Sequence, residues 1–199
     1  NTMSAEALRK LQQEWLPANY PDKKVLGVIR PLVEVASKSS KTKRIGVVGT
    51  RSTIKSNAYE KELTKLDYEI KVVQHACPLL VPLIEEGMLS RPETMKMVRN
   101  YIRPLKQQKI DTLILGCTHY PFLMEQFKKS VGKNIKVLDS PQIVAEKLQD
   151  YLKRHSEIET QLKKSQQHRF LATEVNEVVE SNASKWLGRD VKFEKVELK

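Results

Sequence analysis

The stretch Thr112-Leu113-Ile114-Leu115-Gly116-Cys117-Thr118-His119-Tyr120-Pro121 is the most informative about the fold. It opens with the most apolar strand candidate in the chain, and Gly116 then permits a tight turn. Pro121 suits the first turn of a following helix. A buried strand that passes through a short turn into a helix is typical of a βαβ unit with parallel strands.

Short apolar runs alternate with amphipathic segments along the rest of the chain. Besides 112–115, strands are expected over 25–29, 45–48, 69–73, 135–138, 169–172 and 191–196. Helices are expected over 2–16, 32–39, 56–66, 79–86, 92–102, 141–153 and 174–187 and after Pro121, and a polar surface loop over 156–168. This alternation predicts an α/β protein with mainly parallel sheets, in which ligands bind beyond the carboxyl ends of the strands.

Composition excludes several classes of protein. No apolar run approaches the ~20 residues of a membrane-spanning helix, so no membrane partner is expected. Two cysteines give no disulfide framework, which favours the reducing cytoplasm. The net charge is +11, but the basic residues are scattered and aromatic residues make up only 6%. We therefore expect no nucleic-acid partner.

Cys117 follows the predicted strand at the point where α/β proteins bind ligands. A thiol has an ordinary pKa of ~8.5, and a nearby base or positive charge makes it more reactive. His119 is placed to share the thiol proton, and Thr118 offers a hydroxyl and an amide near a helix start. A buried structural cysteine is the alternative, but strand, glycine, cysteine and histidine together favour a catalytic thiol.

Other kinds of cysteine site fit the sequence poorly. Neither cysteine has an arginine six residues later, and no Cys-x-x-Cys motif occurs. His75, Cys77, Cys117 and His119 are spaced more tightly than the usual ligands of structural zinc, so no metal is expected. No glycine-rich phosphate loop is present either.

Three segments together resemble one family. Leu115–Pro121 is similar to the C-terminal motif of the cofactor-independent glutamate racemases, within the aspartate/glutamate racemases. Gly46–Thr50 followed by Thr53–Tyr59, and Cys77–Glu85, resemble two further segments of that family. The three occur in the family's order, and the resemblance runs from Asn1 to about Leu152, then weakens.

The resemblance implies two α/β domains that face each other across a cleft, each supplying one catalytic cysteine. No cofactor or metal takes part, and the substrate is glutamate, with the D-enantiomer used for peptidoglycan. Cys117 would be the base for one enantiomer and the acid for the other, with His119 assisting. Thr118 and His119 would also bind substrate. Glu85 matches a carboxylate linked to proton handling, although it also reads as a surface glutamate. Family members often form homodimers, so a homodimer is compatible with the resemblance.

The first residues depart from the family pattern. The second thiol of the family stands in a Cys-Asn-Thr segment, and this chain opens with Asn1 and Thr2, which would then bind substrate. Cys77 matches a structural Cys-Pro turn and does not replace that thiol. The resemblance therefore implies the C-terminal part of a racemase, inactive alone. Residues 1–30 would be a remnant of the first domain, which is incomplete, 31–140 the second domain, and 141–199 a segment returning to the first.

Other functions remain open from the sequence. An aspartate racemase would use the same fold on another acid, and a single-thiol relative such as a decarboxylase of the superfamily would keep only the late cysteine. A different class is a non-catalytic α/β binding module, with nucleic acid as a ligand suggested by the charge of +11.

Overall fold

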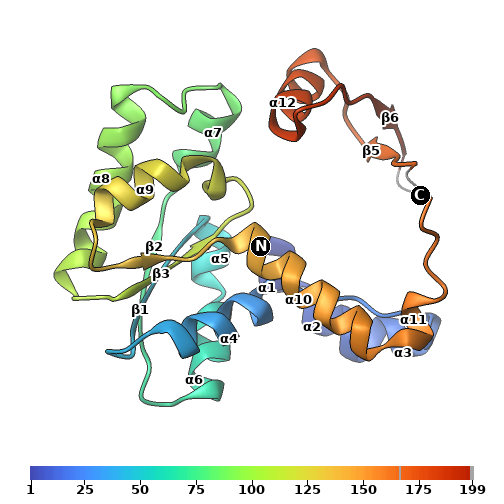
Figure 1. Ribbon diagram of the computed structural model, residues 1–199, viewed down its shortest axis with the longest axis horizontal. Helices are drawn as coiled ribbons and strands as arrows, with labels where there is room; N and C mark the ends of the chain where they lie inside the picture. The colour runs from blue at the N-terminus through green and yellow to red at the C-terminus, as the bar shows by residue number, and fades with distance from the viewer. Residues whose placement is uncertain (166, 198–199) are drawn as a thin grey trace. The chain divides into compact units, whose positions relative to one another are not determined.

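The computed structural model describes residues 1–165 and 167–197. The chain divides into two compact units, Asn1–Tyr151 and Leu152–Lys199, and each is described by itself (Figure 1). Helix α10, Ser140–Arg154, runs through the boundary between the two units. The three-part division drawn from the family resemblance stays a prediction.

A four-stranded parallel sheet forms the centre of the first unit. Its strands are β1 (Arg44–Gly49), β2 (Lys71–Ala76), β3 (Thr112–Gly116) and β4 (Lys136–Val137), in the order β2-β1-β3-β4. Every residue of the central strand β3 is buried, as expected for a parallel sheet covered on both faces. The prediction of an α/β fold with a parallel sheet is confirmed.

Helices cover both faces of this sheet (Figure 1). On one face lie α8 (Pro92–Gln107) and α9 (Met124–Val131), and on the other α4 (Ile29–Ser39) and α6 (Ala58–Leu66). The shorter helices of this part are α5 (Arg51–Lys55), α7 (Leu80–Glu85) and the 3₁₀ turn η2 (Tyr120–Leu123). Side chains of α4 and α6 pack with β1 and β3 into one apolar core.

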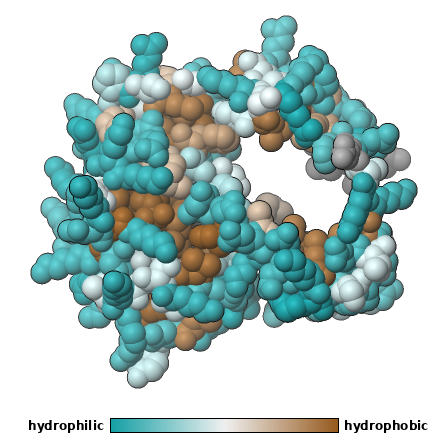
Figure 2. Space-filling model, viewed as in Figure 1, coloured by the Kyte–Doolittle hydropathy of each residue, from teal (hydrophilic) through white to brown (hydrophobic). Residues whose placement is uncertain are grey.

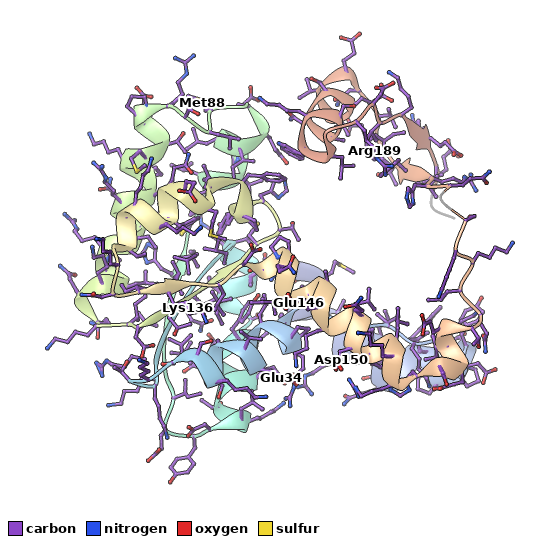
Figure 3. The ribbon with its side chains drawn as sticks, viewed as in Figure 1. Glu34, Met88, Lys136, Glu146, Asp150 and Arg189 are labelled. Atoms are coloured by element: carbon purple, nitrogen blue, oxygen red, sulfur yellow. The ribbon has the colours of Figure 1, made fainter. Side chains whose placement is uncertain are left out.

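The salt bridge between Glu34 and Lys147 joins α4 to α10 at 3.1 Å. Figure 3 labels Glu34 on α4, beside α10. Arg30, one helical turn before Glu34, donates to the same carboxylate at 2.9 Å. Burial raises the pKa of Glu34, but the hydrogen bonds from Arg30 and Lys147 outweigh it and leave the pKa lowered. This pairing fixes the first part of α10 on the sheet unit.

The N-terminal segment is helical from Thr2 to Asn19, in the pieces α1 (Thr2–Glu6), α2 (Leu8–Lys10), the π-helical turn η1 (Leu11–Trp15) and α3 (Leu16–Asn19). Of residues 1–28, all of which the structure describes, Leu16 alone is buried. Met3 and Trp15 remain exposed to solvent. Figure 2 shows hydrophobic residues at the surface of the first unit among hydrophilic ones. The apolar side of this helical segment is thus largely uncovered within its own unit.

Some predicted elements differ from the structure. The predicted strand over 25–29 is wrong: 25–28 form no regular element, and Ile29 begins α4. A strand needs a neighbour to satisfy its backbone groups, and none of the described strands pairs with this segment. Helix α8 continues past Pro104 to Gln107, because Leu105 completes the buried stripe of Val98 and Ile102.

The second unit contains a small βαβ arrangement. Strands β5 (Phe170–Ala172) and β6 (Phe193–Lys195) pair in parallel, and helix α12 (Glu177–Leu187) connects them. The strand, helix and strand predicted over 169–172, 174–187 and 191–196 are thus confirmed. Asn176 caps α12 through its side-chain oxygen, and Gly188 ends it with φ +64°. The predicted loop 156–168 begins with a short helix, α11 (Ser156–Glu159), and its Gln166 lies outside the described residues. Among the described residues, no helix combines the length and apolar character needed to cross a bilayer.

Candidate active site at the carboxyl ends of the strands

Cys117 is the first residue after β3, at the carboxyl end of the sheet. It is 6% exposed. Burial raises the pKa of the Cys117 thiol; the backbone N–H groups of His119 and Tyr120 act against this, and the charge of Glu85 adds to it. The net pKa lies above that of an ordinary thiol, so Cys117 is largely protonated at neutral pH.

Two glycines let the backbones approach closely here. Gly116 is the register partner of Gly49, the last residue of β1. A Cβ atom on Gly116 would lie 2.8 Å from the carbonyl oxygen of Val48 and 3.0 Å from Cε2 of Tyr59. Only glycine fits at this position without displacing the strand that carries Cys117.

His119 and Glu85 come together across the site. The imidazole Nε2 of His119 lies 3.2 Å from Oε1 of Glu85, at the end of α7. His119 is 28% exposed and Glu85 53% exposed, so both can meet a ligand or solvent. The sequence left two interpretations of Glu85, a carboxylate that takes part in proton handling and an ordinary surface glutamate. The contact with His119 favours the first.

Asn1 and Thr2 lie against the carboxyl end of β1 and the helices that follow. The Asn1 side-chain amide donates a hydrogen bond to the Tyr59 hydroxyl. The hydroxyl of Thr2 lies 3.2 Å from that of Thr50 and 3.3 Å from that of Thr53. The Tyr59 ring also packs against Gly116, the residue before Cys117. These contacts bring the N-terminal residues close to the thiol.

Thr118 lies in the turn between Cys117 and η2 and is exposed. This exposed residue stands next to the thiol, as a substrate-binding role requires. That role stays a prediction.

Cys77 occupies a different environment from Cys117. It is completely buried, and burial raises the pKa of its thiol strongly. Its backbone N–H donates to the carbonyl of Gly49 at 2.9 Å, and its own carbonyl accepts from the Tyr120 hydroxyl at 2.9 Å. These contacts tie the turn after β2 to β1 and to η2, which is a structural role.

Tyr59, Thr50 and Thr53 are site neighbours to which the sequence assigns no role. Thr50 follows a strand end, and its hydroxyl caps α5 by accepting from the Thr53 N–H at 3.3 Å. Position alone could have indicated Thr50, because ligands gather at strand ends. Tyr59 carries no such signal, since it reads as an ordinary apolar position of α6. In the described part of the chain, no three His, Cys, Asp or Glu side chains cluster as metal ligands would.

The chain belongs to the Asp/Glu/hydantoin racemase family, which it matches over residues 3–148. Within that family, several curated relatives that it matches carry the name glutamate racemase. It is 46% identical over 153 residues to the protein of Aquifex aeolicus, a match that covers 77% of this chain and 56% of that protein. It is 37% identical over 198 residues to the protein of a Sulfurihydrogenibium species, covering 100% of this chain and 70% of that protein. The chain thus spans little more than half the length of its Aquifex relative.

Solved structures agree with this assignment. Glutamate racemase isoform RacE1 from Bacillus anthracis superposes with a TM-score of 0.88 at 37% identity, covering 99% of this chain and 71% of that one. The glutamate racemase of Francisella tularensis, solved in complex with D-glutamate, superposes with a TM-score of 0.84 at 28% identity, covering 98% and 70%. The chain therefore has the racemase fold over nearly its whole length.

Proposed function

We propose that these residues form one half of a glutamate racemase site, in which Cys117 exchanges the α-proton on one face of the amino acid. The observation that carries the proposal is the strand-end thiol beside a histidine paired with a carboxylate. The names of the relatives, and the D-glutamate bound to the Francisella protein, support glutamate as substrate. The function served is the supply of D-glutamate for peptidoglycan, in the cytoplasm and without a cofactor.

The buried thiol sets the first step of the chemistry. Cys117 rests as a neutral thiol because burial raises its pKa, so a base must first take its proton. His119 is that base in our proposal, and the Glu85 carboxylate at 3.2 Å stabilises the resulting imidazolium. The Cys117 thiolate then takes the α-hydrogen of glutamate as a proton, and the electron pair of the broken C–H bond remains on the α-carbon.

Racemisation also needs a proton donor on the opposite face of that carbon. Cys77 is unsuited to this role, because it is fully buried and its backbone holds the turn in place. The second acid therefore comes from outside residues 1–199. Asn1 and Thr2 hold the amino acid between the two groups, together with Thr118.

Glutamate is preferred over aspartate because the relatives at 36–46% identity are named glutamate racemases. The aspartate racemase and the single-thiol enzyme remain the alternatives. A single-thiol enzyme would need no second acid, whereas a racemase would. An experiment that supplies or withholds the second acid therefore distinguishes the two.

The test is a chimera. The part of the Bacillus anthracis protein that precedes the matched region is joined ahead of Asn1, and conversion of L-glutamate to D-glutamate is followed by chiral chromatography. We expect the chimera to racemise glutamate, and its Cys117→Ser variant to lose at least about a thousandfold in rate, as removal of a catalytic group commonly does.

L-Aspartate is the substrate control in the same assay. A chimera with a native circular dichroism spectrum that leaves L-glutamate unchanged would contradict the proposal. Faster conversion of aspartate than of glutamate would favour the aspartate racemase instead, and activity that survives Cys117→Ser would remove Cys117 from the mechanism.

A further inference from the structure

Tyr59 connects the two sides of the site. Its side chain is completely buried at the start of α6. The hydroxyl accepts a hydrogen bond from the Asn1 side chain. The ring packs against the backbone of Gly116, since a Cβ atom there would lie 3.0 Å from Cε2 and 3.4 Å from Cζ. One side chain thus touches both the proposed substrate-binding asparagine and the residue that precedes the thiol.

The local backbone explains why Tyr59 points inward. Asn57 adopts a left-handed conformation, with φ +54°, and separates α5 from α6. The chain therefore turns sharply, and the first turn of α6 faces the sheet. Tyr59 joins the core formed by α4, α6, β1 and β3. A ring anchored in this core is a rigid support for its hydroxyl.

The hydrogen bond restricts what Asn1 presents to a ligand. An asparagine amide has two N–H donors and an oxygen that accepts. When one N–H is held by the Tyr59 hydroxyl, the amide cannot rotate freely, and the direction of its oxygen is fixed. Burial raises the pKa of Tyr59 strongly, so the hydroxyl stays neutral at physiological pH.

We infer that Tyr59 is a positioning residue, which fixes the Asn1 amide so that it binds the amino or carboxylate group of the substrate beside Cys117. This inference rests on the proposed function. Tyr59 itself does not touch the substrate, because it lies behind Asn1 and Gly116 in the core.

The test is a double-mutant cycle on glutamate binding, followed by NMR titration of the 199-residue protein. Tyr59→Phe keeps the ring and removes the hydroxyl, and Asn1→Ala removes the amide. We expect each change to weaken glutamate binding about tenfold, as the loss of one hydrogen bond commonly does. Because both changes break one interaction, the double variant should bind no more weakly than Asn1→Ala.

Tyr120→Phe is the matched control, because it removes the hydroxyl of another buried tyrosine, whose bond goes to the Cys77 carbonyl. The effect of Tyr120→Phe on glutamate binding should not depend on Asn1. The effects of Tyr120→Phe and Asn1→Ala on the free energy of binding should therefore add. Additive effects of Tyr59→Phe and Asn1→Ala would overturn the inference.

A second readout does not depend on substrate. The side-chain amide protons of Asn1 should exchange with water measurably faster in Tyr59→Phe than in the wild type, and no faster in Tyr120→Phe. This exchange tests the contact whether or not the wild type binds glutamate, so the inference and the proposed function can fail separately. Equal exchange in the wild type and Tyr59→Phe would overturn the positioning role.

Discussion

The Nε2 atom of His119 lies 3.2 Å from Oε1 of Glu85, although the two residues come from separate elements at the carboxyl end of the sheet. The turn after β3 presents His119 beside Cys117, and the end of α7 presents Glu85. The negative charge of Glu85 raises the pKa of the Cys117 thiol. In the proposed site, Glu85 therefore acts both on His119, the proposed proton acceptor, and on the acidity of Cys117.

Removing the charge of Glu85 should make Cys117 more acidic. In Glu85→Gln, the pH profile of Cys117 alkylation should move to lower pH, and only slightly because Glu85 is half exposed. Alkylation by iodoacetamide, resolved for each cysteine by mass spectrometry, measures the profile. Glu86→Gln removes the same charge one residue away and is the control. If the alkylation profile of Cys117 moved equally in Glu85→Gln and Glu86→Gln, the contact between Glu85 and His119 would have no effect on the acidity of Cys117.

The two cysteines should differ in accessibility. Cys117 is 6% exposed and borders the site, whereas Cys77 is fully buried. We expect iodoacetamide to alkylate the native protein at Cys117 alone. The reaction should be slow at pH 7, because even a thiol of ordinary pKa is only about 3% ionised there. The rate should rise as pH approaches the raised pKa of Cys117. Cys77→Ala should leave this profile unchanged, and modification of Cys77 at the rate of Cys117 would contradict the structure.

Gly116 should tolerate substitution less well than its register partner. Gly116→Ala places a Cβ atom 2.8 Å from the backbone oxygen of Val48, whereas the nearest atom to a Cβ on Gly49 is a side-chain carbon of Ile54 at 3.2 Å. We expect Gly116→Ala to lower the free energy of unfolding by about 1–3 kcal/mol and Gly49→Ala by less. Urea denaturation measures both losses. A larger loss in Gly49→Ala than in Gly116→Ala would show that the strand end at Gly116 is not tightly packed.

Asp111 should stabilise the turn before β1 in a pH-dependent way. Its carboxylate accepts from the backbone N–H groups of Lys41 and Thr42 at 2.7 and 2.6 Å and from the Ser40 hydroxyl at 2.6 Å. Burial raises the pKa of Asp111, but the hydrogen bonds from Ser40 and Thr42 outweigh it, so the pKa is lowered. The contribution of Asp111 is thus complete above the unfolded pKa of ~3.9 and is lost as pH falls through the folded pKa.

The measurement on Asp111 is the free energy of unfolding at pH 7 and at pH 3. Asp111→Asn should cost about 1–3 kcal/mol at pH 7, with the difference from wild type narrowing toward pH 3. Asp22→Asn, at an exposed position, controls for the loss of charge. A difference that is the same at both pH values would show that the carboxylate charge does not hold the turn.

The central sheet could be predicted from local patterns. The buried runs of β1 and β3 are apolar enough to identify, and Gly116 marks the strand end where Cys117 stands. Their carboxyl ends converge because parallel strands share one direction, so a site near Cys117 follows from the sequence.

Long-range pairing could not be predicted in the same way. Residues 25–29 have strand composition but lack a paired neighbour among the described strands, so tertiary context overrides propensity. The role of Tyr59 depends on the turn at Asn57 and on a contact with Asn1, which no local pattern encodes. The contact of Glu85 with His119 likewise comes from the fold, and the family resemblance was the signal that pointed to Glu85.

The most direct test is deuterium exchange at the α-carbon of glutamate, followed by proton NMR while the 199-residue protein acts in D₂O. When the Cys117 thiolate takes the α-hydrogen, the new S–H exchanges with solvent, and deuterium returns to the same face. We expect exchange with retention of configuration in one enantiomer, no conversion of L- to D-glutamate, loss of exchange in Cys117→Ser, and normal exchange in Cys77→Ala. Exchange that survives Cys117→Ser, exchange that is absent from the wild type, or racemisation by these residues alone would contradict the claim that Cys117 is one thiol of a two-thiol site.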